Sequence, residues 1–125
     1  MFEGLKSYES QLRSVLRIAA GLLILQHGTQ KLLSFPVPPP FELQPIHYAA
    51  GVIELVGGIL FILGLFTRPV AFILSGFTAV AYWGWHAPQG FYPLLNGGEL
   101  AALYSFVFLY FVAAGPGVWS VDEKR

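Results

Sequence analysis

Residues 45–68 read PIHYAAGVIELVGGILFILGLFTR, and this stretch decides the fold because it combines an apolar run of membrane length with one acid. Between Tyr48 and Phe66 the only formally charged residue is Glu54. A helix of about 20 apolar residues crosses the hydrocarbon core of a bilayer, which is roughly 30 Å thick. A core helix of a soluble protein is seldom apolar on every face. The stretch therefore predicts a membrane-spanning helix.

One face of this predicted helix carries two ionisable residues and two glycines. His47, Gly51, Glu54 and Gly58 share that face, because they follow one another at helical spacing. Glycines on a helix face let a neighbouring helix approach closely. A carboxylate exposed to lipid costs at least about 2.5–3.5 kcal/mol. Glu54 is therefore expected to face the protein interior, on the glycine side, with a cationic partner.

The overall composition suits a lipid environment better than water. Of 125 residues, 55% are hydrophobic and 11% are charged, whereas about 25% are charged in a typical soluble domain. The formal net charge is zero, so the basic surface that nucleic-acid binding needs is missing and we expect no nucleic-acid partner. The chain has no cysteine, which excludes disulfides, thiol catalysis and iron–sulfur ligation by this chain. Redox chemistry would have to use a bound cofactor or another subunit.

The rest of the chain predicts three more apolar helices, and hence an all-α, integral membrane four-helix bundle formed by a single domain. The expected helices cover about residues 12–34, 46–66, 69–86 and 97–114. Five prolines within residues 34–45 break the chain after the first helix. A short link before Pro69 makes the second and third helices antiparallel neighbours. Asn96 is expected to N-cap the last helix, three residues before Glu99.

The distribution of basic residues predicts the orientation in the membrane. Four helices place both termini on one side. Nearly all basic residues fall on that side: Lys6, Arg13, Arg17, Arg68, Lys124 and Arg125. Lys31 is the one left on the other side. Because positive charge marks the cytoplasmic side, both termini are expected in the cytoplasm.

This orientation brings the remaining polar residues together in the outer half of the predicted bundle. We expect Glu54, Lys31 and His27 to form a catalytic polar core. Residues expected to contact a ligand are His86, Glu99, His47, Tyr82 and Trp83. Ionisable groups inside a membrane usually serve function. The alternatives are a purely structural Lys31–Glu54 pair, solvated interfacial histidines at 47 and 86, and a helix-capping role for Glu99.

The chemistry of this cluster favours a quinone over a metal. The chain has no His-x-x-x-His and no Glu-x-x-His pair, the helical ligand patterns of bundle metal sites, so we expect no metal site. A haem held by His27 and His86 is the weaker alternative. A quinone, or another planar lipid-soluble ligand, fits better, because polar groups can bond its carbonyl oxygens while aromatic side chains form apolar walls. Glu54 would handle protons in such a site.

Four short motifs resemble those of a known family. They are QHGTQK at 26–31, ELVGG at 54–58 with LGLFTR at 63–68, NGGE at 96–99, and GPGVWSVD at 115–122. In this order, over nearly the whole chain, they resemble the DoxX family of small four-helix bacterial membrane proteins. The resemblance implies a multi-pass protein of the bacterial plasma membrane. Its relatives include a subunit of thiosulfate:quinone oxidoreductase and proteins linked to quinone or oxidative-stress responses.

The function expected from residues and resemblance together is a quinone-associated redox protein, or a subunit of a membrane oxidoreductase complex. Whether the chain catalyses a reaction by itself stays open, and its partners would be the bilayer and oxidoreductase subunits. The alternative is a non-enzymatic membrane protein that binds a lipid-like ligand or supports assembly of a partner complex. A homo-oligomer formed through Gly57 and Gly64 is also left open. Arg68 and Asp122 are interpreted as structural, pairing with each other or with Arg17.

Overall fold

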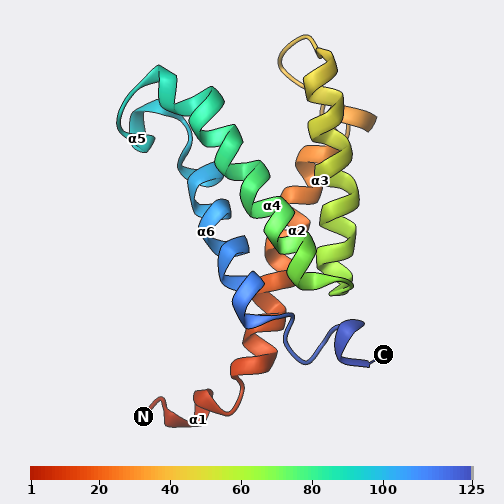
Figure 1. The fold of residues 1–125 in the computed structure, drawn as a ribbon, viewed down its shortest axis with the longest axis vertical. Coiled ribbons are helices and arrows are strands. Elements are labelled where there is room, and N and C mark those ends of the chain that lie inside the picture. Colours follow the sequence, from red (N-terminus) through yellow and green to blue (C-terminus); the bar gives the residue numbers. More distant parts are fainter. Residues whose placement is uncertain (125) are drawn as a thin grey trace. The chain divides into compact units, whose positions relative to one another are not determined.

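The computed structural model describes residues 1–124, and within them the chain is all-α with no β-strand, which confirms the all-α part of the predicted fold class. Six α-helices follow one another: α1 Glu3–Lys6, α2 Glu9–Leu33, α3 Pro45–Leu63, α4 Thr67–Ala81, α5 Pro93–Asn96 and α6 Glu99–Ala114 (Figure 1). A π-helical turn, η1 Tyr82–His86, and a 3-10 turn, η2 Ala87–Gln89, continue α4, and η3 Asp122–Lys124 ends the described chain.

The chain forms two compact units. The first unit contains Met1–Thr67 and the tail from Pro116 onward, and the second unit is Arg68–Gly115. The predicted four-helix bundle with both termini on one side requires an arrangement of both units, and it stays a prediction. Within residues 1–124, α3 is the one helix long and apolar enough to cross a membrane, and α6 is apolar but shorter.

In the first unit, α2 and α3 pack through glycines with their backbones nearly touching. A Cβ atom added to Gly28 would lie 2.6 Å from the backbone nitrogen of Leu55. One added to Gly58 would lie 3.1 Å from the Cα of Leu25. Gly51, Glu54 and Gly58 are all on the buried face of α3. The predicted glycine face is therefore confirmed, and α2 is the helix that packs against it.

Left-handed backbone conformations and a capping box mark the ends of these two helices. Ser34 adopts a left-handed conformation, with φ of 54°, at the C-cap of α2. Gln44 and His47 form a reciprocal capping box where α3 begins, which satisfies N–H groups that a helix start leaves without partners. Gly64 ends α3 with φ of 69°, a conformation that glycine adopts without steric cost.

The C-terminal tail packs back onto the end of α3. The N–H groups of Val121 and Asp122 donate to the carbonyls of Leu63 and Gly64, at 3.0 and 2.9 Å. A Cβ atom added to Gly64 would collide with Ser120. The tail of the same chain therefore covers Gly64, and the homo-oligomer that the sequence left open stays untested.

Asp122 and Arg68 bind backbone groups. The Asp122 carboxylate accepts hydrogen bonds from the N–H groups of Phe66 and Thr67, at 2.9 and 2.8 Å, and so caps the start of α4. The Arg68 guanidinium donates to the carbonyl of Ala113 at 3.0 Å, near the end of α6. A structural role was expected for both residues, and the pairing of Asp122 with Arg68 or Arg17 stays a prediction.

In the second unit, α4 and α6 are joined by a short hydrogen bond from the Ser75 hydroxyl to the carbonyl of Ser105, at 2.8 Å. The N-cap residue of α6 is Gly98, and Asn96 is the last residue of α5. The prediction that Asn96 caps α6 is wrong, because Gly97 adopts a left-handed conformation, with φ of 72°, and turns the chain between the two helices.

Candidate functional site

A buried ion pair joins α2 to α3. The Lys31 ammonium lies 2.7 Å from Oε1 of Glu54, and the two side chains are only 15% and 6% exposed. Each residue lies about one helical turn after a glycine of the packed face, Gly28 on α2 and Gly51 on α3. The close backbone approach at these glycines brings the charged side chains within reach of each other. The predicted Lys31–Glu54 pair is confirmed, and its role in catalysis stays a prediction.

The ion pair has unused hydrogen-bonding capacity. An ammonium group carries three N–H donors, and among residues 1–124 the Lys31 ammonium donates to Glu54 alone. His27 is half-buried on the same helix, one turn before Lys31, so the two residues share a helix face. This part of the first unit can therefore offer donors to an oxygen atom of a ligand, beside a carboxylate that can exchange a proton.

His47 has a local structural task. Its Nδ1 accepts a hydrogen bond from the backbone N–H of Gln44 at 3.0 Å. Its ring lies 4.8 Å from the ring of Phe41, measured between centroids. These contacts account for a histidine at the start of α3. The expectation that His47 also contacts a ligand stays a prediction.

Two of the other predicted residues meet within the second unit. The Tyr82 ring is buried and stacks on the His86 ring, with 6.4 Å between centroids. Nδ1 of His86 lies 3.1 Å from the carbonyl oxygen of Asn96. The Asn96 side chain donates to the Tyr82 hydroxyl at 3.2 Å. Tyr82 and His86 thus belong to a polar cluster organised by Asn96.

The remaining two predicted residues lie on the surface of the second unit. Trp83 is 70% exposed, and Glu99 is exposed at the first position of α6. Neither takes part in the hydrogen bonds around Asn96. The expectation that residues of both units converge on one ligand site stays a prediction.

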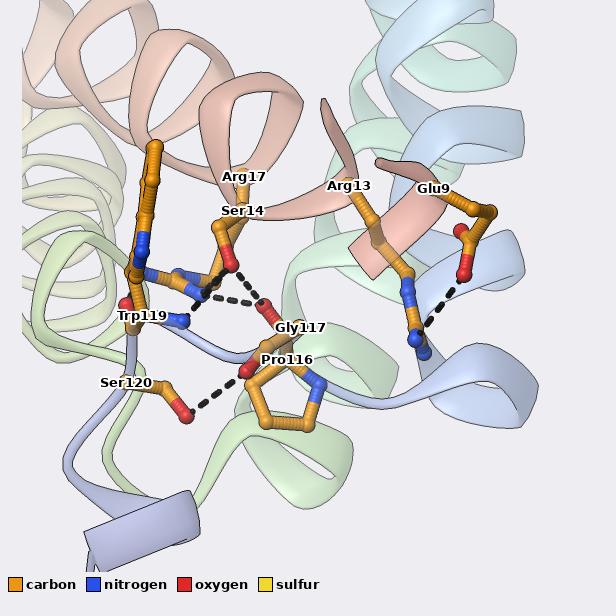
Figure 2. Close-up of polar contacts among 8 residues, drawn as sticks. All are labelled: Glu9, Arg13, Ser14, Arg17, Pro116, Gly117, Trp119 and Ser120. Atoms are coloured by element: carbon orange, nitrogen blue, oxygen red, sulfur yellow. Dashed lines mark hydrogen bonds and ion pairs between the residues drawn. The ribbon is translucent and has the colours of Figure 1, made fainter. Parts of the chain in front are cut away.

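Arg17, which sequence reasoning took only as a partner for an acid, is the centre of a second buried contact. Its side chain is 1% exposed. Its guanidinium donates to the carbonyl oxygens of Phe61 and Ile62 at the end of α3. It also donates to those of Pro116 and Trp119 in the tail (Figure 2). We call Arg17, these carbonyls and Ser14 the arginine clamp. An arginine inside a predicted span was the signal that could have identified it.

Ser14 completes the arginine clamp and explains a glycine of the tail. Its hydroxyl accepts a hydrogen bond from the Trp119 N–H at 3.0 Å (Figure 2). Gly117 has φ of 83°, and a Cβ atom there would collide with the Ser14 hydroxyl. The GPG motif is therefore needed for the tail to pass against α2.

Metal ligands do not cluster in the described part of the chain. Among residues 1–124, no group of three or more histidine, aspartate or glutamate side chains is arranged to hold a metal ion. The first unit instead contains two buried cationic contacts, the Lys31–Glu54 ion pair and the arginine clamp, at different positions along α2.

These features define a class of small helical protein, with apolar exteriors and charged side chains buried between close-packed helices. The DoxX family model matches residues 12–87, and the chain belongs to this family. The sequence-based family assignment is thereby confirmed.

Proteins of two bacteria are similar over most of the chain. A Haemophilus influenzae protein described as uncharacterized is 47% identical over 127 residues, covering 96% of this chain and 95% of the relative. A Mycobacterium tuberculosis protein described as an uncharacterized membrane protein is 31% identical over 130 residues, covering 87% of this chain and 78% of that protein. No solved structure matches the chain significantly.

Proposed function

We propose that this chain is a quinone-associated redox protein or a subunit of a membrane oxidoreductase complex, with its ligand site at Lys31 and Glu54. The observation that carries the proposal is the buried ion pair between α2 and α3, 2.7 Å long. Ionisable residues within membrane helices are costly and usually mark a functional pathway. The unused donors of Lys31 distinguish this pair from a fully satisfied structural contact.

The proposal places the chain in the bacterial plasma membrane as a multi-pass protein. Only 28% of the apolar window in α3 is buried within the protein. The exposed remainder includes Val52, Val56 and Ile59, which are 51%, 51% and 45% exposed. Contiguous apolar surface of this kind is unfavourable in water and suits lipid. The Mycobacterium tuberculosis relative described as a membrane protein supports the same location.

The residues of the ion pair fit a quinone. Lys31 would donate an N–H to a quinone carbonyl oxygen, and Glu54 would hold or release a proton beside it. His27, one turn before Lys31, would extend the path for that proton. A bound quinone supplies two-electron, two-proton chemistry. Because the chain has no cysteine, a partner subunit would deliver the electrons.

The first experiment is to purify the protein in its own lipids and measure bound quinone by mass spectrometry. We expect a near-stoichiometric quinone in the wild type and its loss in Glu54→Gln. The matched control is Glu123→Gln, which removes the same charge at an exposed position outside the candidate site and should leave the quinone bound.

A double variant separates binding from folding. Glu54→Gln alone leaves a buried ammonium without its carboxylate, which is expected to cost about 3–5 kcal/mol of stability. Lys31→Gln with Glu54→Gln replaces the ion pair by two neutral amides that can bond each other. If this double variant folds like the wild type and retains the quinone, the ion pair does not bind it and the proposal fails.

The second candidate is a non-enzymatic membrane protein that binds a lipid-like ligand or supports assembly of a partner complex. The observation that favours it is the short Lys31–Glu54 contact itself, because each group already neutralises the other, as a structural interhelical pair requires. In this case the purified protein carries no quinone, and the double variant supports the same amount of assembled complex as the wild type.

A further inference from the structure

The connection between α4 and α6 turns its apolar side chains outward. Phe91, Leu94 and Leu95 are 87%, 77% and 76% exposed. Trp83, Trp85 and Tyr92 are exposed as well. In contrast, the side chain of Asn96 at the end of this connection is buried, with 4% of the residue exposed. We call residues 83–95 the aromatic loop; in Figure 1 it lies around α5 at one end of the α4–α6 pair.

Hydrogen bonds, and not an apolar core, hold the aromatic loop together. The Asn96 amide donates to the carbonyl of Gly90 at 3.0 Å, and its Oδ1 accepts from the N–H of Gly98 at 2.8 Å. The Gln89 side chain donates to the carbonyl of Trp85 at 2.6 Å. These bonds satisfy backbone groups that a loop would otherwise present to water.

The loop is also closely packed on its inner side. A Cβ atom added to Gly98 would lie 2.6 Å from the Cβ of His86 and 2.7 Å from the Tyr82 ring. The inner side is therefore filled by Tyr82, His86 and the Asn96 amide. The large apolar side chains are left outside, which is the reverse of a loop folded in water, where burial of such side chains is the main gain.

We propose that the aromatic loop lies in the headgroup–acyl boundary of the lipid bilayer as a rigid anchoring platform. No residue between Pro69 and Gly98 carries a formal charge, so no formal charge opposes entry into this layer. Tryptophan and tyrosine are enriched at this boundary because their rings are apolar while their N–H and O–H groups stay hydrated. The inference rests on the proposed membrane location, and it does not depend on quinone binding.

Lipid is favoured over a protein partner by the scarcity of polar side chains in the aromatic loop. A stable protein interface has an apolar centre and a polar, solvent-accessible rim. Apart from histidine and the aromatic residues, the loop has one polar side chain, that of Gln89, and it is bonded within the loop. The nearest formal charge along the chain, Glu99, comes only after the loop has ended. A loop this poor in polar side chains suits a lipid layer.

The absence of cysteine allows a direct test by spin labelling. Single cysteines at Phe91, Leu94 and Leu95 would carry a nitroxide in nanodiscs of phosphatidylethanolamine and phosphatidylglycerol. Collision with oxygen, which dissolves in lipid, is compared with collision with a water-soluble nickel chelate. Val56→Cys on the exposed face of α3 is the lipid control, and Glu42→Cys, exposed between α2 and α3, is the water control.

We expect the labels at 91, 94, 95 and 56 to collide more often with oxygen than with the nickel chelate. The label at 42 should collide more often with the nickel chelate. Nickel collisions in excess at the three loop positions, with Val56 in lipid, would overturn the platform while leaving the membrane location standing. Labels at 91, 94 and 95 that neither reagent reaches would show a covering protein, and would also overturn it. A label at position 56 that lies in water would contradict the membrane location itself, and with it the anchoring platform.

Discussion

Arg17 and Lys31 are two buried cations on the same helix, and their partners differ in kind. They lie on α2 about 21 Å apart at 1.5 Å per residue. The Arg17 guanidinium donates to four carbonyl oxygens, whereas the Lys31 ammonium donates to one carboxylate. Carbonyl oxygens do not exchange protons near neutral pH, so these hydrogen bonds of the arginine clamp hold the fold. The Lys31–Glu54 pair contains a group that can lose or gain a proton.

The difference follows from the shapes of the two cations. A guanidinium presents five N–H donors in a rigid planar fork, which can join several segments at once. An ammonium is a compact charge on a flexible stem. At the arginine clamp three segments meet, namely α2, the end of α3 and the tail. At Lys31 the contact joins two helices and leaves donors for a ligand.

Loss of the Arg17 fork should have the largest effect on stability. Arg17→Met removes the hydrogen bonds to the four carbonyls and leaves some of those groups buried without a donor. We expect the free energy of unfolding to fall by about 1–3 kcal/mol for each carbonyl that is left buried without a donor. Denaturation in mixed detergent–SDS micelles measures this change.

Arg13→Gln is the control for Arg17→Met. Arg13 forms an ion pair with Glu9 one turn away on α2, worth about 0.3–0.5 kcal/mol. Equal losses of stability in the two variants would contradict a special role for the arginine clamp.

The close contact between α2 and α3 near Lys31 can be tested by adding one methyl group. Gly28→Ala places a Cβ atom 2.6 Å from the backbone nitrogen of Leu55, so α2 and α3 must separate. We expect a loss of about 1–3 kcal/mol, typical of overpacking, and weaker quinone retention, because the ion pair depends on this approach. Thermal unfolding and quinone content are measured on the same preparation.

Gly76→Ala is the matched control, since nothing lies within 4 Å of a Cβ atom added at that position on α4. It should be neutral or stabilising by up to about 1 kcal/mol, because alanine favours a helix over glycine. A Gly28→Ala protein as stable as Gly76→Ala would show that α2 and α3 do not need the close contact.

The smallest effect is expected where the tail caps α4. Asp122→Ala removes the carboxylate that accepts from the N–H groups of Phe66 and Thr67. Loss of such a cap costs about 0.5–2 kcal/mol. Limited proteolysis should cut the tail faster in this variant. The control is Glu123→Ala, at the exposed next residue, whose tail should be cut at the wild-type rate. Faster cutting of the tail in both variants would show that loss of negative charge alone causes the effect.

Sequence periodicity was sufficient for features that arise within a helix or between two packed helices. Gly51, Glu54 and Gly58 share a face because of helical geometry alone. The pairing of Glu54 with Lys31 could be predicted because a buried carboxylate needs a cation. Asn96 shows where this approach fails: its spacing to Glu99 suggested a capping box, but Gly97 and Gly98 separate it from α6.

The sequence by itself therefore determined the all-α class, the apolar helix α3, its inward glycine face, the need for a partner to Glu54 and the membership of the DoxX family. Only the tertiary structure decided the arginine clamp, the docking of the tail over Gly64 and the cap that Asp122 places on α4. The physical reason is the separation along the sequence between the residues that interact. Helical patterns act over one or two turns, whereas Ser14 and Trp119 are 105 positions apart, and only the folded chain brings them together.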